Sequence, residues 1–301
     1  MSERARLAIA LVAIYLVWGS TYLAIAIGVR TLPPLAMASA RFATAGIALY
    51  GFLRARGVPA PSLVEWRTGA ITAFFLLLGG NGVVSLNARA LPSGIVALLI
   101  ATTPLFMVLL PWLARGPRPR GRTILAIGLG LLGVAALARP GSTEGSLPLA
   151  NVLAIVFASA SWSVGSLVSK RLPAAGSPMM ATAQQMTAGG VLLFVASALR
   201  GELGRVDPSA FSTESLVAFA YLTIVGSITG FGAYVWLLRN TSPAVATSYA
   251  YVNPLVALVL GHLIAHEPLG PRTGLAAALI VGSVVLLVTD AGKAAREAAD
   301  Q

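Results

Sequence analysis

The sequence predicts an all-α integral membrane protein whose ten transmembrane helices form two inverted five-helix repeats around a central cavity. The first observation is composition: 57% of the 301 residues are hydrophobic and 10% are charged, against roughly 25% charged residues in average soluble domains. The second observation is that Lys and Arg alternate in number between successive connections. The third is that residues of the first half recur in the second half at a nearly fixed offset.

Ten apolar segments account for the predicted helices. Breaks at Gly, Pro and Arg clusters divide the chain into pieces close to the ~17–25 residues that cross a bilayer. The first piece follows Arg4 and Arg6 as a signal peptide would, but its length and the lack of a small-residue cleavage site favour a spanning helix. The predicted spans are 7–29, 35–54, 67–87, 92–114, 122–139, 148–169, 178–200, 215–238, 243–264 and 272–290.

Connections on alternate sides of the predicted bundle differ in positive charge. Of the 21 Lys and Arg residues, 14 lie in the termini and the connections on their side, 6 lie on the opposite side, and Arg41 lies inside the second span. Because cytoplasmic loops are enriched in Lys and Arg, both termini are predicted to be cytoplasmic. The net charge of +11 is then explained by the basic residues of the cytoplasmic connections. It does not indicate a nucleic-acid partner, since the basic residues form no continuous patch.

The two halves of the sequence repeat. Trp18 precedes Trp162 by 144 residues, and later the offset becomes 150, as between Leu91–Leu105 and Thr241–Leu255. Each repeat holds five helices, an odd number, so the second copy must enter the membrane inverted. Inverted repeats are typical of alternating-access carriers, whose substrate site lies near the midplane between the repeats. The predicted repeats, within one membrane domain, are 1–144 and 145–301.

Several short motifs resemble those of a known family. They are Trp-Gly-Ser-Thr-Tyr at 18–22, Arg41 in the second span, Thr-Pro-Leu at 103–105 and Asn-Pro-Leu at 253–255. With the duplication, these motifs resemble the EamA-type branch of the drug/metabolite transporter superfamily over essentially the whole chain. Within that branch the length and the aromatic-rich midplane are similar to bacterial exporters of aromatic and other neutral amino acids of the YddG type.

This resemblance implies a fold and a location. The fold is a ten-helix basket whose cavity is lined mainly by the first, third, fourth, sixth, eighth and ninth helices, with the fifth and tenth more peripheral. The location is the bacterial inner membrane. We expect a monomer in the lipid bilayer that binds a small-molecule substrate and no cofactor.

Polar and aromatic side chains inside the spans are the candidates for the substrate site, because a lipid-facing surface does not tolerate polar groups. Trp18 and Trp162 are repeat equivalents, so we expect them to face one another across a shared cavity. The alternative is an interfacial aromatic belt, which the near-central positions of both residues disfavour. The candidate substrate-binding residues are Trp18, Ser20, Tyr22, Asn81, Ser85, Thr102, Trp162, Ser163, Ser166, Tyr234, Thr247, Tyr251 and Asn253.

Three further residues are assigned gating or structural roles. Pro104 and Pro254 occupy matching places in the fourth and ninth spans and predict interrupted helices there, a feature of transporter sites. A packing kink satisfied by neighbouring hydroxyls is the alternative. Arg41, whose repeat equivalent is the neutral Gln185, is the one charge well inside a span. We assign it a structural or gating role, with bidentate binding of a substrate carboxylate as the alternative.

The predicted function is export of small neutral or zwitterionic metabolites, with aromatic and other neutral amino acids as the first candidates. A cavity of Trp, Tyr, Ser, Thr and Asn suits a solute with an apolar body and polar groups. Because no span contains a central Asp or Glu, we expect facilitated, gradient-driven transport. Other metabolites or drugs, and a gated channel, stay open as alternatives.

Enzymatic activity is not expected from this sequence. It contains no Cys and no carboxylate near the middle of a span, and its two His residues, His262 and His266, stand at the end of the ninth span. A nucleophile with its base, paired carboxylates and a set of metal ligands are therefore all missing from the predicted membrane interior. We expect neither a metal nor a cofactor.

Overall fold

The computed structural model describes residues 3–116, 118–138, 147–241, 245 and 248–299, and this part of the chain is helical with no strand. The first half contains α1 (Glu3–Gly28), α2 (Pro34–Ala55), α3 (Leu63–Ala73), the π-helix η1 (Phe74–Gly82), α4 (Val83–Asn87), α5 (Ser93–Ile100), α6 (Thr103–Leu113) and α7 (Gly121–Ala138). The second half contains α8 (Leu149–Ser169), α9 (Pro178–Leu199), the 3-10 turns η2 (Leu203–Arg205) and η3 (Pro208–Ala210), α10 (Thr213–Tyr221), the π-helix η4 (Leu222–Thr229), α11 (Gly230–Asn240), α13 (Tyr249–Ala265) and α14 (Pro271–Ala299).

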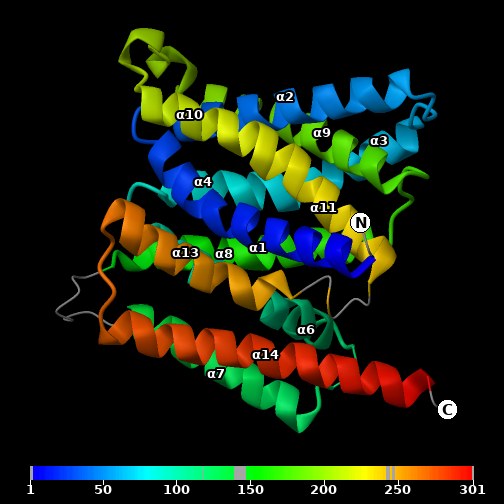
Figure 1. The fold of residues 1–301 in the computed structure, drawn as a ribbon, viewed down its shortest axis with the longest axis vertical. Coiled ribbons are helices and arrows are strands. Elements are labelled where there is room, and N and C mark those ends of the chain that lie inside the picture. The colour runs from blue at the N-terminus through cyan, green and yellow to red at the C-terminus, as the bar shows by residue number, and fades with distance from the viewer. Residues whose placement is uncertain (1–2, 117, 139–146, 242–244, 246–247, 300–301) are drawn as a thin grey trace.

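These helices supply the spans that hydropathy predicts. Within the described residues, nine helical stretches are long and apolar enough to cross a membrane, and α13, with 17 residues, coincides with the remaining predicted span, 243–264. The third, fourth and eighth spans are each assembled from consecutive helical pieces. The prediction of an all-α membrane protein is confirmed. Because each half holds an odd number of spans, α1 begins and α14 ends on the same side of the bundle (Figure 1).

One predicted boundary is wrong for a local reason. The third span begins at Leu63 and not at 67, because Ser62 and Glu65 form a reciprocal capping box. The Glu65 side chain accepts from the Ser62 N–H at 2.6 Å, and the Ser62 hydroxyl accepts from the Glu65 N–H at 3.3 Å. This arrangement satisfies N–H groups that the first turn leaves unpaired, so a polar turn precedes the apolar run that hydropathy detects.

The repeat is visible in the backbone where α2 and α9 end. Gly57 and Gly201, 144 residues apart, both have positive φ, +78° and +68°. The next residues close the same six-residue turn: the Val58 N–H donates to the Leu53 carbonyl at 3.0 Å, and the N–H of residue 202 donates to the carbonyl of residue 197 at 2.9 Å. Both ends are Schellman motifs, which place glycine where a left-handed residue is needed.

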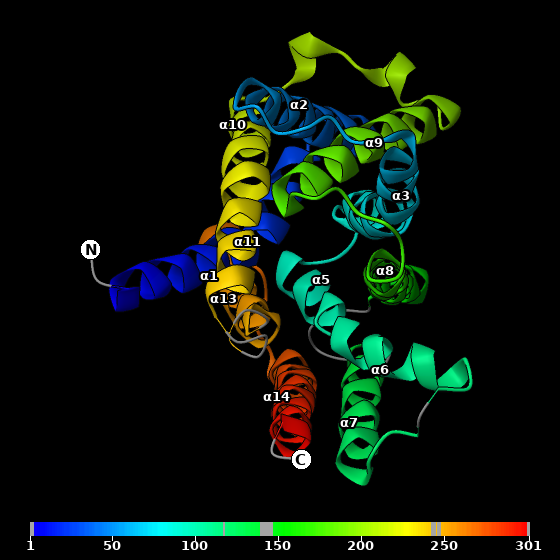
Figure 2. The same cartoon turned by 90° about the vertical axis from the view of Figure 1, so that its right-hand side faces the viewer.

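The two repeats meet most closely where α2 crosses α9. A Cβ on Gly46 would collide with the backbone of Thr187, and a Cβ on its equivalent Gly190 would lie 2.6 Å from the Ala43 nitrogen. Small residues permit such backbone contact between membrane helices. Figure 2 shows α2 and α9 together at one end of the bundle and the α7–α14 pair at the other. The fifth and tenth spans are therefore peripheral.

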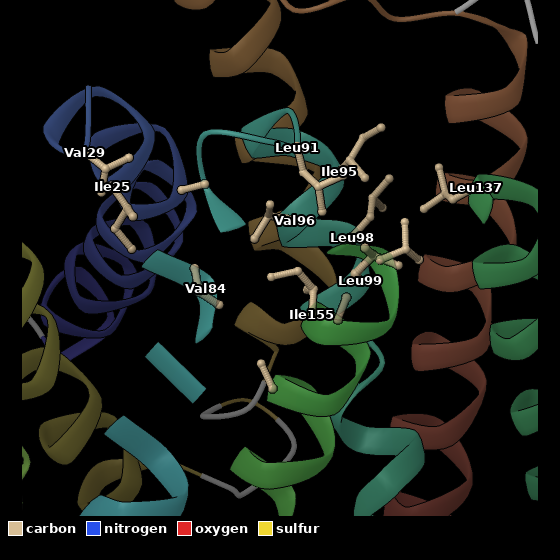
Figure 3. Packing of buried hydrophobic residues seen from close by; sticks show 14 of the residues in the cluster. Ile25, Val29, Val84, Leu91, Ile95, Val96, Leu98, Leu99, Leu137 and Ile155 are labelled. Carbon is tan, nitrogen blue, oxygen red and sulfur yellow. The ribbon is translucent and has the colours of Figure 1, made fainter. Parts of the chain in front are cut away.

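A hydrophobic cluster seals the end of the bundle away from the chain termini. Its members come from the last turns of α1, from α4 and α5, from the first half of α8, and from the ends of α7 and α14 that lie beside them, with Leu222 at the start of η4. Figure 3 shows Ile25, Val29, Val96, Leu99 and Ile155 among its members. Leu98 and Leu99 are fully buried. This cluster lies between the middle of the bundle and the surface on the side away from the termini.

Two carboxylates of the second half cap helices of the first half at the same sealed end. Glu202, 5% exposed, follows α9 and accepts from the N–H groups of Leu35 at 2.8 Å and Ala36 at 3.1 Å in the first turn of α2. Glu267 follows α13 and accepts from the first two N–H groups of α5 at 2.7 and 3.1 Å. Helix starts have unpaired N–H groups and a positive dipole end, so both caps join the repeats favourably.

Candidate functional site

A cavity of about 850 Å³ lies between the two repeats. Two of its lining residues, Ile25 and Val84, belong to the hydrophobic cluster, and the cavity extends from there along the spans toward the side of the termini. Lys170 and Pro178, at the ends of α8 and α9 on that side, line it and are exposed. The cavity therefore reaches from the middle of the bundle to the side that carries the termini.

More spans line this cavity than the resemblance implies. The first, third, fourth, sixth, eighth and ninth spans contribute, as expected, but α2 adds Arg41 and Phe42 and α9 adds a polar strip. The peripheral α14 adds Leu287 and Val288 at the mouth. The lining residues that the sequence did not predict include Thr21, Thr68, Thr72, Gln184, Gln185, Phe231 and Tyr249.

An aromatic box surrounds Trp18 on one wall of the cavity. The Trp18 ring centroid lies 5.3 Å from that of Phe231, 5.3 Å from Tyr234 and 5.0 Å from Tyr249. The Trp18 Nε1–H donates to the Gly226 carbonyl at 3.3 Å, so the indole nitrogen is satisfied while the ring lines the cavity. Such edge and tilted pairs are the favoured geometries of aromatic packing.

Tyr249 could have been found from helical spacing. The candidate site residues predicted in the ninth span include Thr247 and Tyr251, which are one turn apart. Tyr251 is not among the cavity-lining residues, whereas Tyr249 and Asn253, also one turn apart, both line the cavity. Choosing the register that contains the predicted Asn253 would have selected Tyr249. Thr247 lies outside the described residues.

Trp162 lines the cavity from α8, with Ser166 one turn further along the same helix. A Cβ on Gly80 of η1 would lie 3.0 Å from the Trp162 ring, so the absence of a side chain at Gly80 leaves room for the indole. The predicted residues Tyr22 and Asn81 also line the cavity. The structure thus brings Trp18 and Trp162, with these polar neighbours, to one shared space.

Several predicted hydroxyls do not line the cavity. Ser20 donates to the Val17 carbonyl at 2.9 Å and contacts the Tyr221 hydroxyl at 2.6 Å. Thr102 donates to the Leu99 carbonyl at 2.6 Å, and Ser163 donates to the Ser159 carbonyl at 2.9 Å. A hydroxyl inside a helix can satisfy itself on the preceding turn, so its polarity does not require an aqueous neighbour. Ser85 is likewise buried and absent from the lining.

The two prolines line the cavity but behave differently. Pro104 stands in the first turn of α6, just after the break that separates α6 from α5. Pro254 lies inside α13, which continues through it. The predicted interruption is therefore present at Pro104 and absent at Pro254 itself.

Two amides on the cavity wall carry buried atoms with no hydrogen-bond partner in the described part of the chain. They are Asn253, through its Oδ1, and Gln184, through its Nε2. Asn253 is 7% exposed and Gln184 is 1% exposed. Unsatisfied buried polar atoms are costly, and neither of these two atoms is accessible to solvent in this conformation.

Arg41 is the charged group at the depth of the aromatic box. It is 6% exposed and lines the cavity. Its Nε–H donates to the Ser227 hydroxyl at 3.0 Å, and its guanidinium carbon lies 4.7 Å from the Phe42 ring centroid. A Cβ on Gly226 would lie 3.4 Å from Nη2, so the guanidinium packs against the same π-helical turn that accepts from Trp18.

Among the described residues, no group of three His, Asp or Glu side chains could hold a metal ion. The cavity is instead built from aromatic rings, neutral amides, hydroxyls and one deep cation. This composition suits reversible binding of an organic solute of modest size.

Comparison with known proteins places this geometry in context. The model of the EamA-like transporter family matches residues 6–139 and 149–289. The chain is 42% identical over 281 residues to the uncharacterized inner membrane transporter YedA of Escherichia coli K12, covering 92% of this chain and 89% of that protein.

More distant relatives and a solved structure also match this chain over most of its length. The chain is 24% identical to a probable amino-acid metabolite efflux pump of Escherichia coli K12, covering 91% of this chain and 92% of that one. It is 28% identical to the protein PecM of Dickeya dadantii, covering 90% and 86%. A crystal structure that is 21% identical matches with a TM-score of 0.61 over 95% of this chain and 96% of that chain, which supports the fold.

Proposed function

The chain belongs to the EamA-like transporter family, and from this premise we propose that it exports small neutral or zwitterionic metabolites, aromatic and other neutral amino acids first among them. It is a multi-pass transporter of the inner membrane. The observation that carries the proposal is the aromatic box of Trp18, Phe231, Tyr234 and Tyr249 on the wall of an otherwise neutral cavity.

The chemistry of the cavity supports this substrate class. Rings of a solute pack well on the edges and faces of aromatic side chains. The amide residues Asn81, Asn253 and Gln184 add neutral polar groups to the lining of the cavity. Phosphorylated sugars fit poorly, because Arg41 is the only basic residue at depth among the described lining residues and Lys170 stands at the exposed mouth.

The proposed mechanism is alternating access. In the present conformation the cavity reaches the side of the termini and a hydrophobic cluster closes the other end. An inverted repeat supplies the second conformation, because each half can adopt the arrangement of the other. With both termini in the cytoplasm, as the distribution of Lys and Arg favours, the present conformation would load substrate from the cytoplasm.

We infer that transport is facilitated and not driven by protons. Of the described residues that line the cavity, Glu65 is the only carboxylate, and it lies at the mouth in a helix cap. Proton-coupled carriers usually hold a titratable group within the membrane. Vesicles with an imposed pH gradient test the inference: robust uphill accumulation of substrate would contradict it.

The substrate assignment is tested in two steps. Cells that express the chain are challenged with toxic analogues of phenylalanine, tryptophan, nucleosides and drugs, and survival identifies what is expelled. The purified protein is then placed in liposomes, where we expect saturable uptake of labelled phenylalanine that internal unlabelled phenylalanine stimulates. Resistance to nucleosides or drugs alone would overturn the amino-acid assignment.

A gated channel is the second candidate. A cavity that is open to one side, as in this structure, is compatible with a channel as well as with a carrier. Counter-transport stimulation requires one site that faces each side in turn, whereas a channel gives current proportional to voltage. Ohmic currents in planar bilayers without counter-transport would favour the channel.

A further inference from the structure

Arg41 presents a buried positive charge to the cavity with little to balance it. Burial of an isolated ion costs several kcal/mol unless it is paired and hydrogen-bonded. The contacts described above, one serine hydroxyl and one phenylalanine ring, are neutral. The one carboxylate among the described lining residues, Glu65, accepts from both the N–H and the hydroxyl of Ser62 at the mouth.

The orientation of the guanidinium leaves donors for a ligand. Nε is engaged with Ser227 on η4, whereas Nη2 packs beside Gly226 at the cavity wall. Gly226 also accepts from Trp18, so the guanidinium and the aromatic box meet on one π-helical turn. A planar guanidinium binds carboxylates through two parallel hydrogen bonds.

We propose that Arg41 binds the carboxylate of the transported solute, so that the substrates are aromatic and apolar carboxylates, α-amino acids among them, and not the corresponding amines or amides. The apolar body of the solute packs against Trp18 and its neighbours, while its carboxylate neutralises the positive charge of Arg41 beside η4. The proposal rests on the proposed function and narrows its substrate class. It moves Arg41 from a gating or structural role to direct recognition.

The proposal also accounts for the difference between the repeats at this position. Gln185, the equivalent of Arg41, donates from its Nε2 to the Thr72 hydroxyl at 3.0 Å and lines the cavity as a neutral group. One cation and one amide at equivalent places give the cavity a single anion site. A solute with one carboxylate then has one preferred orientation.

The test measures ligand selectivity with the purified full-length protein in detergent. Thermal stabilisation is recorded with phenylalanine, phenylalaninamide, phenethylamine and 3-phenylpropionate. We expect the two carboxylates to stabilise the wild type and the amide and amine to do so at least about 10-fold more weakly. Arg41→Gln should lower carboxylate affinity about 10- to 100-fold, the scale of a charge-assisted hydrogen-bond pair. Arg41→Lys should keep the carboxylate preference at reduced affinity.

Arg56→Gln is the matched control. Arg56 lies at the end of the same helix, its guanidinium carbon is 5.1 Å from the Phe52 ring, and it is exposed and outside the cavity lining. This variant should bind all four compounds as the wild type does. Unchanged carboxylate preference in Arg41→Gln would overturn the proposal. So would equal stabilisation of the wild type by phenylalanine and its amide, even if Arg41→Gln does not fold.

A second pair of ligands separates this proposal from the amino-acid assignment. Indole-3-acetate and indole-3-acetamide carry no ammonium group. If neither phenylalanine nor its amide binds, but the acetate binds in preference to the acetamide and loses this preference in Arg41→Gln, the carboxylate site stands and the amino-acid assignment fails. If amino acids are transported but no carboxylate preference exists, the reverse holds.

Discussion

The two repeats have the same backbone where their helices end but different side chains at equivalent places. After α2 the Schellman turn carries Val58, and after α9 the same turn carries Glu202. After α13 the Glu267 N–H donates to the Gly261 carbonyl at 3.1 Å, and its counterpart in the first repeat, residue 117, lies outside the described residues.

The consequence of this difference is an inequality between the two ends of the molecule. The carboxylates cap helices of the opposite repeat at the sealed end, whereas Val58, the equivalent of Glu202, stands at the end where the cavity opens. In the proposed alternating-access cycle, duplication supplies two states of similar backbone, and we expect side chains at a few helix ends to decide which one is favoured. Exchanging residues between equivalent positions tests this conclusion.

The largest effect is expected for the tryptophans. Trp18 packs against three rings, whereas Trp162 rests on Gly80. Because aromatic pairs contribute about 0.5–1.5 kcal/mol each, Trp18→Ala should lower the flux of aromatic substrates on the order of 10-fold or more, and Trp162→Ala should lower it less. Uptake into proteoliposomes is the measurement. Trp112→Ala, on the outer surface of α6, is the control, and equal losses in the two cavity variants would contradict the asymmetry.

Glu202→Ala should reduce stability more than its repeat counterpart Val58→Ala. The Glu202 side chain accepts from two backbone N–H groups and from the Ser197 hydroxyl at 3.3 Å in a buried setting. Hydrogen bonds to charged groups contribute about 1.5–3 kcal/mol, so the melting temperature in detergent should fall by several degrees. A fall no greater than that of Val58→Ala would show that the cap adds no stability.

Glu267→Gln should loosen the sealed end without unfolding the protein, because one amide oxygen still accepts from the start of α5. The chain contains no Cys, so a single Cys at the buried Val96 reports access to the seal. A membrane-impermeant maleimide added on the side away from the termini should label the double variant about 5-fold faster than V96C alone, a bias of about 1 kcal/mol. Identical labelling rates would mean that this cap does not hold the seal.

The smallest effect is expected when a cap is added to the open end. Val58 packs beside Met179 and Met180, which stand where Leu35 and Ala36 stand in the first repeat. Val58→Glu should cap the start of α9 and raise the melting temperature by the equivalent of about 0.5–1 kcal/mol. Val58→Gln is the uncharged control, and a lower melting temperature in the glutamate variant alone would refute the equivalence.

Hydropathy and charge alternation predicted the spans well because a bilayer imposes length and polarity on every helix. The π-helices η1 and η4 were not predictable in this way. They occupy corresponding parts of the third and eighth spans, where their wider turns expose Gly226 and Gly80 to the two tryptophans. A change from α-helical to π-helical hydrogen bonding inside an apolar run leaves the hydropathy unchanged, so the hydropathy pattern does not reveal a π-helix.

The cavity was predicted in part, for an equally physical reason. Large side chains such as Trp18, Tyr22 and Trp162 were selected correctly as lining residues, because their bulk needs space between helices. Hydroxyls such as those of Ser20 and Ser163 misled, because a carbonyl one turn back satisfies them in any environment. Which face a short polar residue presents depends on helix rotation, and this is fixed only by packing.

The glycine crossing of α2 and α9 has a consequence for motion. Gly46 and Gly190 are equivalent residues that touch the opposite helix, so the crossing maps onto itself when the two repeats exchange roles. In the proposed alternating-access cycle, a contact of this kind would be the same in both access states, whichever end of the cavity is open. In that cycle we expect the crossing to be the fixed point about which the halves rock, while unsymmetrical contacts, including the carboxylate caps, change.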